Sequence, residues 1–382
     1  MSRKQKICFS MLAILALSFG ILFCLVHFPG WKAPDGLSIC SQWRIVSQLR
    51  RIQNSGICPD DTDSVESKLI ELGFPTVDSD PLYPSCLANS DALYSFWQRA
   101  CAGEDAQLSV LRVTEDCRLH HMFFLQQKND RIFVLTEASL DEDGKLTDIS
   151  TSLMPIYDME LADWDIFYYR LSPSDPHYID NNQLRLKPAD RALYDLNRKY
   201  ILPVGYEMIN LFLVDWQEGI WGDLSFNALL EPLYLLKNGK ALDWSVWLRP
   251  GVSPYAYIPS AVFEDTICSF FSISRTELQT LCNYDPESDT YPYRPINGND
   301  LTTWEYPMCE PEVLSCTENP DGTLKLEISI YSPERKTNCL FRHELTVRPG
   351  SSGHFQYVSN HISAIGEWGL PPAMPRFSLD AK

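Results

Sequence analysis

A run of uncharged, mostly apolar residues from Ile7 to Phe28 constrains the fold more than any other feature. As an α-helix, this run would span about 33 Å, close to the hydrocarbon thickness of a bilayer at about 30 Å. No acidic residue precedes it, and three basic residues do: Arg3, Lys4 and Lys6. Because cationic flanks stay on the cytoplasmic side of a membrane, the sequence predicts a cytoplasmic tail over 1–6, a single transmembrane helix over 7–28 and an exported remainder.

Two other interpretations share this N-terminus. A cleaved signal peptide needs a small-x-small site after the apolar run, whereas Pro29 and the bulky Trp31 follow it here. A lipoprotein would use Cys24, but Phe23 stands where a small residue is needed. We therefore expect an uncleaved signal-anchor that contacts the lipid bilayer through residues 7–28, with cleavage and lipidation as the alternatives.

The exported part has the composition of a folded, acidic protein. Hydrophobic residues make up 45% of the chain and charged residues 21%, which is typical of globular domains. The net charge is −18, and setting aside the three N-terminal cations leaves −21. A surface of that sign repels nucleic acid and anionic headgroups, so no nucleic-acid partner is expected.

Of the twelve cysteines, ten lie outside the predicted membrane helix. They form no CxxC pair and no zinc-type cluster, so the sequence favours neither a redox centre nor a structural metal site. An exported location permits disulfides, and we expect some bridges whose connectivity the spacing leaves open. The ten are Cys40, Cys58, Cys86, Cys101, Cys117, Cys268, Cys282, Cys309, Cys316 and Cys339.

Helical periodicity gives way to strand periodicity in the first half of the exported part. Helices are predicted over 42–52, 61–75 and 89–103. In the second of these, Asp63 and Glu66 fit a capping pair. Short runs rich in Val, Ile, Phe and Tyr then predict an antiparallel meander, with strands over 107–114, 121–127, 131–137 and 165–171.

The second half repeats this order. Helices are predicted over 188–200, 223–237 and 259–271, and Ser274 with Glu277 forms a capping box for one more. A loop rich in Pro, Tyr and Asn follows over 283–307. Apolar and polar residues then alternate over 323–331 and 340–348, which predicts antiparallel strands with one buried and one solvated face.

The predicted fold class is α+β, with a single N-terminal transmembrane helix and then helices followed by antiparallel β-meanders, in two lobes. The expected domain boundaries are a linker with a weak helix over 29–60, an N-terminal α+β lobe over 61–175, a C-terminal α+β lobe over 176–362 and a C-terminal tail over 363–382.

Several short motifs carry a resemblance to a known family: KPAD at 187–190, KYILPVGY at 199–206, NLFLVDW at 210–216, PEV at 311–313, HELTVRP at 343–349 and FQYVSN at 355–360. By these motifs, the part from 64 to 362 resembles an uncharacterised family of exported clostridial proteins, domain of unknown function 6070. The resemblance implies membrane-anchored or secreted proteins without an assigned activity, so it transfers no functional residue. One departure is Pro232, which removes an amide donor and argues against a continuous helix over 223–237.

Three polar features invite a metal or catalytic interpretation. His120 and His121 are adjacent, and adjacent strand residues point to opposite faces, so packing is favoured over metal binding. The acidic stretch 141–144 lacks the spacing of an EF-hand and predicts a hairpin turn. His343 lies on the apolar side of its predicted strand and is expected to be buried and hydrogen-bonded. The sequence therefore predicts no metal site and no cofactor.

Two groups of aromatic residues are ligand-contact candidates. Trp216 and Trp221 lie near Asp215 and Asp223, and carboxylates beside aromatic rings suit a glycan-active enzyme in which the two aspartates are catalytic; they equally suit the edge of an amphipathic core. The second group falls in the predicted loop and could form a contact surface or pack against its domain. It consists of Tyr291, Tyr293, Trp304 and Tyr306.

These observations favour a non-enzymatic, membrane-anchored extracellular module that binds a protein or a cell-wall component. The predicted location is the cell membrane, with a cytoplasmic N-terminus and an extracellular C-terminal domain. The alternative is a cell-wall- or glycan-active enzyme that uses the acidic residues near Trp216. A deep acidic cleft lined by aromatic residues would favour the enzyme, and a flat apolar patch would favour the binding module.

Overall fold

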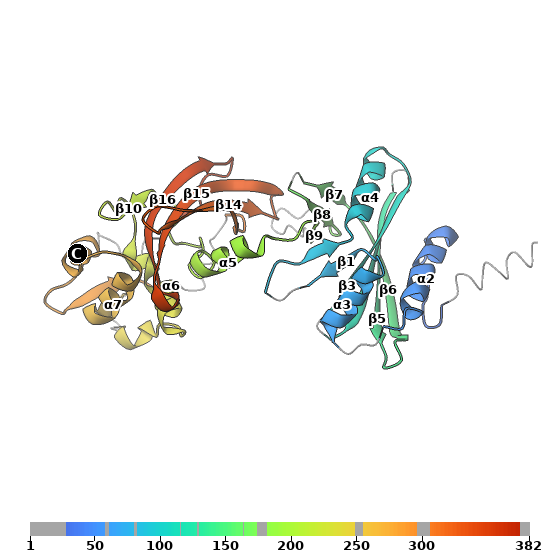
Figure 1. The fold of residues 1–382 in the computed structure, drawn as a ribbon, viewed down its shortest axis with the longest axis horizontal. Coiled ribbons are helices and arrows are strands. Elements are labelled where there is room, and N and C mark those ends of the chain that lie inside the picture. The colour runs from blue at the N-terminus through green and yellow to red at the C-terminus, as the bar shows by residue number, and fades with distance from the viewer. Residues whose placement is uncertain are drawn as a thin grey trace, which may run out of the picture. The chain divides into compact units, whose positions relative to one another are not determined.

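The computed structural model describes residues 28–57, 61–79, 82–114, 116–127, 130–162, 164–173, 182–248, 255–295 and 306–374. The predicted membrane helix over 7–28 lies outside these ranges except for Phe28. Within them, no helix is long and apolar enough to cross a membrane. The chain divides into two compact units, with the boundary between Ala189 and Asp190 (Figure 1).

The first unit combines helices with two sheets. Its described helices are α2 (Ile39–Gln53), α3 (Thr62–Glu71) and α4 (Asp91–Cys101). Its described strands are β1 (Thr76–Asp78), β2 (Cys86–Ala88), β3 (Ala106–Val113), β4 (Arg118–Gln127), β5 (Asp130–Leu140), β6 (Leu146–Pro155), β7 (Asp158–Leu161), β8 (Ile166–Arg170) and β9 (Asn182–Arg185).

The larger sheet of the first unit has the strand order β2-β1-β3-β4-β5-β6, and the smaller one β7-β8-β9. Side chains of β4 alternate between two cores. Leu119 and Phe123 point into the core shared with α2 and α3, and Met122 and Phe124 point into the core shared with α4 and β8. Because both faces of the sheet are covered, β4 is buried without interruption from His121 to Gln126.

The start of α3 differs from the prediction. Asp61 is its N-cap, and the Ser64 amide donates to Asp61 Oδ1 over 2.7 Å. The predicted capping pair of Asp63 and Glu66 is therefore wrong. Glu66 is instead buried, and its Oε2 accepts a hydrogen bond of 3.0 Å from the Ser79 amide. An aspartate placed two residues earlier than predicted satisfies the free amides of the first helical turn.

The second unit has its own helices and sheets. Its described helices are α5 (Arg191–Tyr200), α6 (Phe226–Asn238), α7 (Ser260–Phe270) and α8 (Arg275–Leu281), with short 3₁₀ turns at Trp244–Trp247 and Ser351–Gly353. Its described strands are β10 (Trp216–Gln217), β11 (Ala256–Pro259), β12 (Thr290–Tyr293), β13 (Glu310–Glu318), β14 (Leu324–Ser332), β15 (Thr337–Pro349) and β16 (Phe355–Ile365).

A five-stranded antiparallel sheet with the order β10-β16-β15-β14-β13 forms one side of the core of the second unit. Leu326 and Ile328 of β14 are fully buried on its inner face, which confirms the predicted alternation. On the outer face Lys325 forms an ion pair with Glu344 of β15 over 2.8 Å. The helices and the segment 201–215 pack onto the inner face. The α+β class is thus confirmed for the described residues.

Helix α6 continues through Pro232, contrary to the expected interruption. Leu229, Leu230 and Leu233 surround the proline and are completely buried. Their packing outweighs the lost intrahelical hydrogen bond, because tertiary burial rather than local propensity supplies most helix stability in a folded protein.

Two other element predictions need correction. The region 283–307, predicted as loop, contains β12, which pairs with β11 as an antiparallel two-stranded sheet. The strand pairing of the first unit is not entirely antiparallel, because β1 runs parallel to β3. In addition, no disulfide joins any two of the nine described cysteines, so the expected bridges do not form among them.

Candidate functional site

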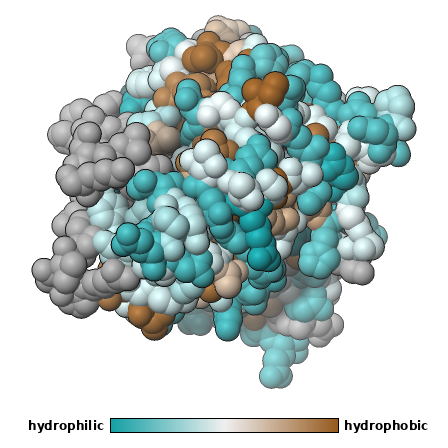
Figure 2. Space-filling model, turned by 90° about the vertical axis from the view of Figure 1, so that its left-hand side faces the viewer, coloured by the Kyte–Doolittle hydropathy of each residue, from teal (hydrophilic) through white to brown (hydrophobic). Residues whose placement is uncertain are grey.

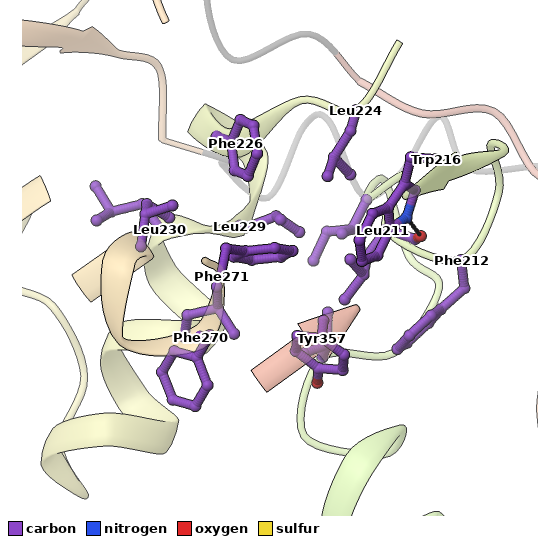
Figure 3. Packing of buried hydrophobic residues seen from close by; sticks show 14 of the residues in the cluster. Leu211, Phe212, Trp216, Leu224, Phe226, Leu229, Leu230, Phe270, Phe271 and Tyr357 are labelled. Carbon is purple, nitrogen blue, oxygen red and sulfur yellow. Dashed lines mark hydrogen bonds between the residues drawn. The ribbon is translucent and has the colours of Figure 1, made fainter. Parts of the chain in front are cut away.

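The two candidate tryptophans lie inside the core of the second unit. Trp216 and Trp221 are only 4% and 5% exposed, and their rings stack with centroids 5.9 Å apart. Trp216 donates from Nε1 to the Leu211 carbonyl over 2.8 Å, the dashed line in Figure 3, with Phe271 packed nearby. Trp221 donates from Nε1 to Glu277 over 2.7 Å. Both rings therefore have their faces and their polar groups engaged within the protein.

Each of the two candidate aspartates makes hydrogen bonds within the second unit. Asp215 Oδ1 accepts a hydrogen bond of 2.6 Å from the Ile362 amide, and Asp215 Oδ2 lies 3.2 Å from His361 Nδ1. These contacts hold the Asp215 carboxylate against the end of β16. The backbone carbonyl of Asp223 accepts from the Asn210 side chain over 2.7 Å, in the turn before α6.

Two of the candidate tyrosines are core residues of β12. Tyr291 and Tyr293 are fully buried. The Tyr291 hydroxyl donates to Glu264 Oε1 over 2.9 Å, and the Tyr293 hydroxyl donates to Glu231. The loop prediction missed that this segment is a strand whose two tyrosine rings are buried in the core of the second unit. Each hydroxyl is satisfied there by a carboxylate.

The remaining candidates give no aromatic contact surface among the described residues. Tyr306 is partly buried, and its hydroxyl donates to the Gly369 carbonyl over 2.7 Å. Trp304 lies outside the described residues. Figure 2 shows one face of the molecule, mostly hydrophilic, with hydrophobic residues in small separate groups. The described residues form no broad apolar patch on that face.

A buried polar network crosses the core of the second unit. The Tyr206 hydroxyl lies 2.7 Å from His343 Nε2, and His343 Nδ1 lies 2.7 Å from Asn360 Oδ1. Asn360 in turn donates to the Val214 carbonyl over 2.9 Å. Because an amide oxygen only accepts, His343 carries its proton on Nδ1 and accepts from Tyr206 at Nε2. Burial lowers the pKa of His343 to about 4. The predicted buried and hydrogen-bonded histidine is confirmed.

A pocket of about 300 Å³ opens beside this network. One wall is the segment that follows α5, and the other is the segment that leads into β13. Three of its side chains carry chemistry, namely Tyr206, Glu207 and Cys309, and the rest of the lining is mostly apolar. The full lining is Leu202, Val204, Gly205, Tyr206, Glu207, Pro307, Met308, Cys309 and Pro311.

The titratable groups of the pocket suit binding better than nucleophilic attack. Burial, followed by the nearby carboxylates of Glu207 and Glu334, raises the pKa of the Cys309 thiol to about 12. Because the thiolate is the nucleophilic form, Cys309 is an unreactive thiol at neutral pH. The Tyr206 hydroxyl is engaged with His343, and burial raises its pKa well above the ordinary value. Glu207 is the one carboxylate among the described residues that line the pocket, and its side chain is exposed to solvent.

A family model matches residues 48–376 and bears the description family of unknown function (DUF6070). The chain belongs to this family. The match confirms the resemblance drawn from the sequence motifs, and its description assigns no activity. No curated protein and no solved structure matches the chain.

The motifs that indicate DUF6070 membership converge on the network and the pocket. The motifs at 199–206, 343–349 and 355–360 each contribute one residue to the network, Tyr206, His343 and Asn360 respectively. The motif at 311–313 supplies Pro311 to the pocket, and four pocket residues come from the motif at 199–206. These motifs are far apart in the sequence, so only the folded structure shows that they meet at one site.

The other polar features of this DUF6070 member have structural roles. His120 lies 3.2 Å from Glu137, whereas His121 is fully buried in the core, so the two histidines point to opposite faces as predicted. Asp141 accepts amide hydrogen bonds within the turn between β5 and β6, which confirms the predicted hairpin turn. In the described ranges, no group of three or more His, Cys, Asp or Glu residues is placed to hold a metal ion.

Proposed function

We propose that the protein is a membrane-tethered module of the cell surface that binds an amine-bearing peptide side chain in the pocket of its second unit. The observation that carries this proposal is the pocket itself. It is a mostly apolar cavity with the Glu207 carboxylate in its lining, and burial keeps the Cys309 thiol and the Tyr206 phenol protonated. The tether in this proposal is the apolar run over 7–28, which would place both units outside the cell.

The ligand class follows from the lining of the pocket. About 300 Å³ is at the small end of ligand sites and accommodates a side chain or a short peptide segment. Leu202, Val204 and Pro311 suit an aliphatic stem, and Glu207 offers a charge-assisted hydrogen bond to an ammonium group. The net charge of −18 would also speed the approach of a cationic partner. A lysine side chain, in a peptide or a cell-wall component, has this combination of stem and charge.

Calorimetric titration of the full chain in detergent micelles tests this proposal. We expect a lysine-containing dipeptide to bind more tightly than the same dipeptide with norleucine, which keeps the stem and lacks the charge. Glu207→Gln should weaken binding of the lysine peptide about tenfold, since a charge-assisted hydrogen bond contributes roughly 1.4 kcal/mol or more. Val204→Trp should block the pocket to both peptides.

The matched control is Glu142→Gln, which removes an exposed carboxylate from a turn of the first unit and should leave binding unchanged. Equal affinity for the lysine and norleucine peptides, or binding that survives Val204→Trp, would contradict the proposed pocket. The glycan-active alternative gains no support from the described residues, because Asp215 is engaged with β16 and Trp216 is buried.

A further inference from the structure

Helix α2 has two apolar faces, and only one of them is covered. Ile45, Leu49 and Ile52 are buried in the core of the first unit. On the outer side, Ile39 and Trp43 are 48% and 42% exposed. They are four residues apart, so they lie next to each other on the helix surface. This neighbouring isoleucine–tryptophan pair forms a small exposed apolar spot on the outer face of α2, which a contact with another surface would cover.

The sequence segment that contains α2 has a net charge opposite to that of the rest of the chain. Residues 28–53 carry four basic side chains and one acidic side chain, Asp35, giving +3. Since the whole chain carries −18 and residues 1–27 carry +3, the part beyond Gln53 carries −24. Arg44, next to Trp43, is exposed. Arg51, by contrast, is engaged with the Leu72 carbonyl and with the ring of a phenylalanine.

The chain path places α2 close to the end of the apolar run. Phe28, the last residue of that run, and Trp31 are both buried in the core that α2 covers. Only ten residues separate Phe28 from Ile39. The first unit therefore has no long spacer between the predicted membrane helix and its own core, and α2 is the first described helix after that run.

We infer that the outer face of α2 lies against the surface of the membrane in which the chain is anchored. Trp43 and Ile39 would sit at the level of the lipid headgroups, where tryptophan is favoured, and Arg44 would face lipid phosphates. Because an anionic surface repels the acidic part of the chain beyond Gln53, the basic segment with α2 is the part of the first unit that such a surface favours. The inference rests on the tether of the proposed function.

The experiment uses the full chain reconstituted into vesicles of phosphatidylcholine and phosphatidylglycerol. A lipid with a nitroxide on its headgroup quenches tryptophan fluorescence only at the membrane surface. Trp43→Phe should lower the quenched emission, whereas the contribution of Trp31, three residues beyond the predicted membrane helix, should stay the same in both proteins. The matched control is Trp97→Phe, because Trp97 of α4 packs on the opposite face of the six-stranded sheet from α2, and its loss should leave the quenched emission unchanged. Arg44→Glu should reduce quenching in vesicles that contain phosphatidylglycerol.

A prior wash of the vesicles at alkaline pH separates the two proposals. If the protein is washed off, the tether is refuted and the inference about α2 falls with it. If the protein stays in the vesicles but wild type and Trp43→Phe are quenched equally, the tether stands and the contact of α2 with the membrane surface is refuted.

Discussion

We expect His121 to make the stability of the first unit sensitive to mild acid. The side chain is completely buried in the core beneath α2 and α3, and neither ring nitrogen has a hydrogen-bond partner. Its neighbours across the sheet are Leu111 and Thr136, and the Phe123 ring lies 6.3 Å away on the same strand. Burial lowers the pKa of His121 to about 4. The imidazole is therefore neutral in the folded protein at pH 7.

The sign and the size of the effect follow from this pKa. Histidine in the unfolded chain has a pKa of about 6.5, so between pH 6.5 and pH 4 the unfolded state binds more protons than the folded state. Stability is then lost as pH falls through this window. For these two pKa values, the free energy of unfolding should drop by about 2 kcal/mol between pH 7.5 and pH 5. Glu66 acts in the opposite direction, because burial raises its pKa.

His121→Leu should remove this pH dependence and raise stability at pH 7. Leucine fills a similar volume without two unsatisfied nitrogens, whose burial costs about 1–3 kcal/mol. Hydrogen exchange of the β4 amides in the full chain measures the opening free energy of the first unit separately from the second. The difference between wild type and variant cancels the contribution of Glu66.

Strand β15 provides an internal control in the same samples, because His343 lies in the second unit and also has a pKa near 4. The β15 amides should keep their acid sensitivity in the His121→Leu variant. If β4 loses the same opening free energy between pH 7.5 and pH 5 in both proteins, or if His121→Leu destabilises β4 at pH 7, the reasoning about the buried imidazole is wrong.

Three further substitutions test the packing, each by urea unfolding. Tyr206→Phe should cost about 1–3 kcal/mol, because it leaves the Nε2 of buried His343 without its donor. Gly144→Ala should cost more than 1 kcal/mol, because φ is +72° and the added Cβ would lie 2.3 Å from the Ile57 carbonyl oxygen. Asp61→Ala should lower the free energy of unfolding by about 1 kcal/mol, because it removes the N-cap of α3. For each of the three substitutions, an unchanged free energy of unfolding would contradict the contact on which the prediction rests.

Elements with strong local periodicity could be predicted from the sequence. The helix expected over 259–271 is α7, and the strand expected over 323–331 is β14. In both, the buried side chains repeat with the period of the element, so the pattern is present in a short window. Strands such as β1 and β10 have two or three residues. They exist only through pairing with distant segments, and such pairing leaves no local pattern.

The candidate site could not be predicted for a related reason. Its walls come from the segment around Val204 and the segment around Cys309, which are far apart in the sequence and have no regular periodicity. The sequence pointed instead to Trp216, because aromatic residues beside acidic ones resemble a binding cleft, and to Tyr291, because it falls in a predicted loop where an aromatic ring could form a contact surface. In the fold these rings form the core, since an aromatic side chain contributes more to stability by burial than most other residues.

The topology of the chain in intact cells tests the central proposal most directly. Protease added outside intact cells should degrade both units beyond Trp31 and spare the segment before it, as followed with antibodies to each unit and to a tag at the N-terminus. Protection of both units until the cells are lysed, or release of the whole protein into the medium, would contradict a membrane-tethered module of the cell surface.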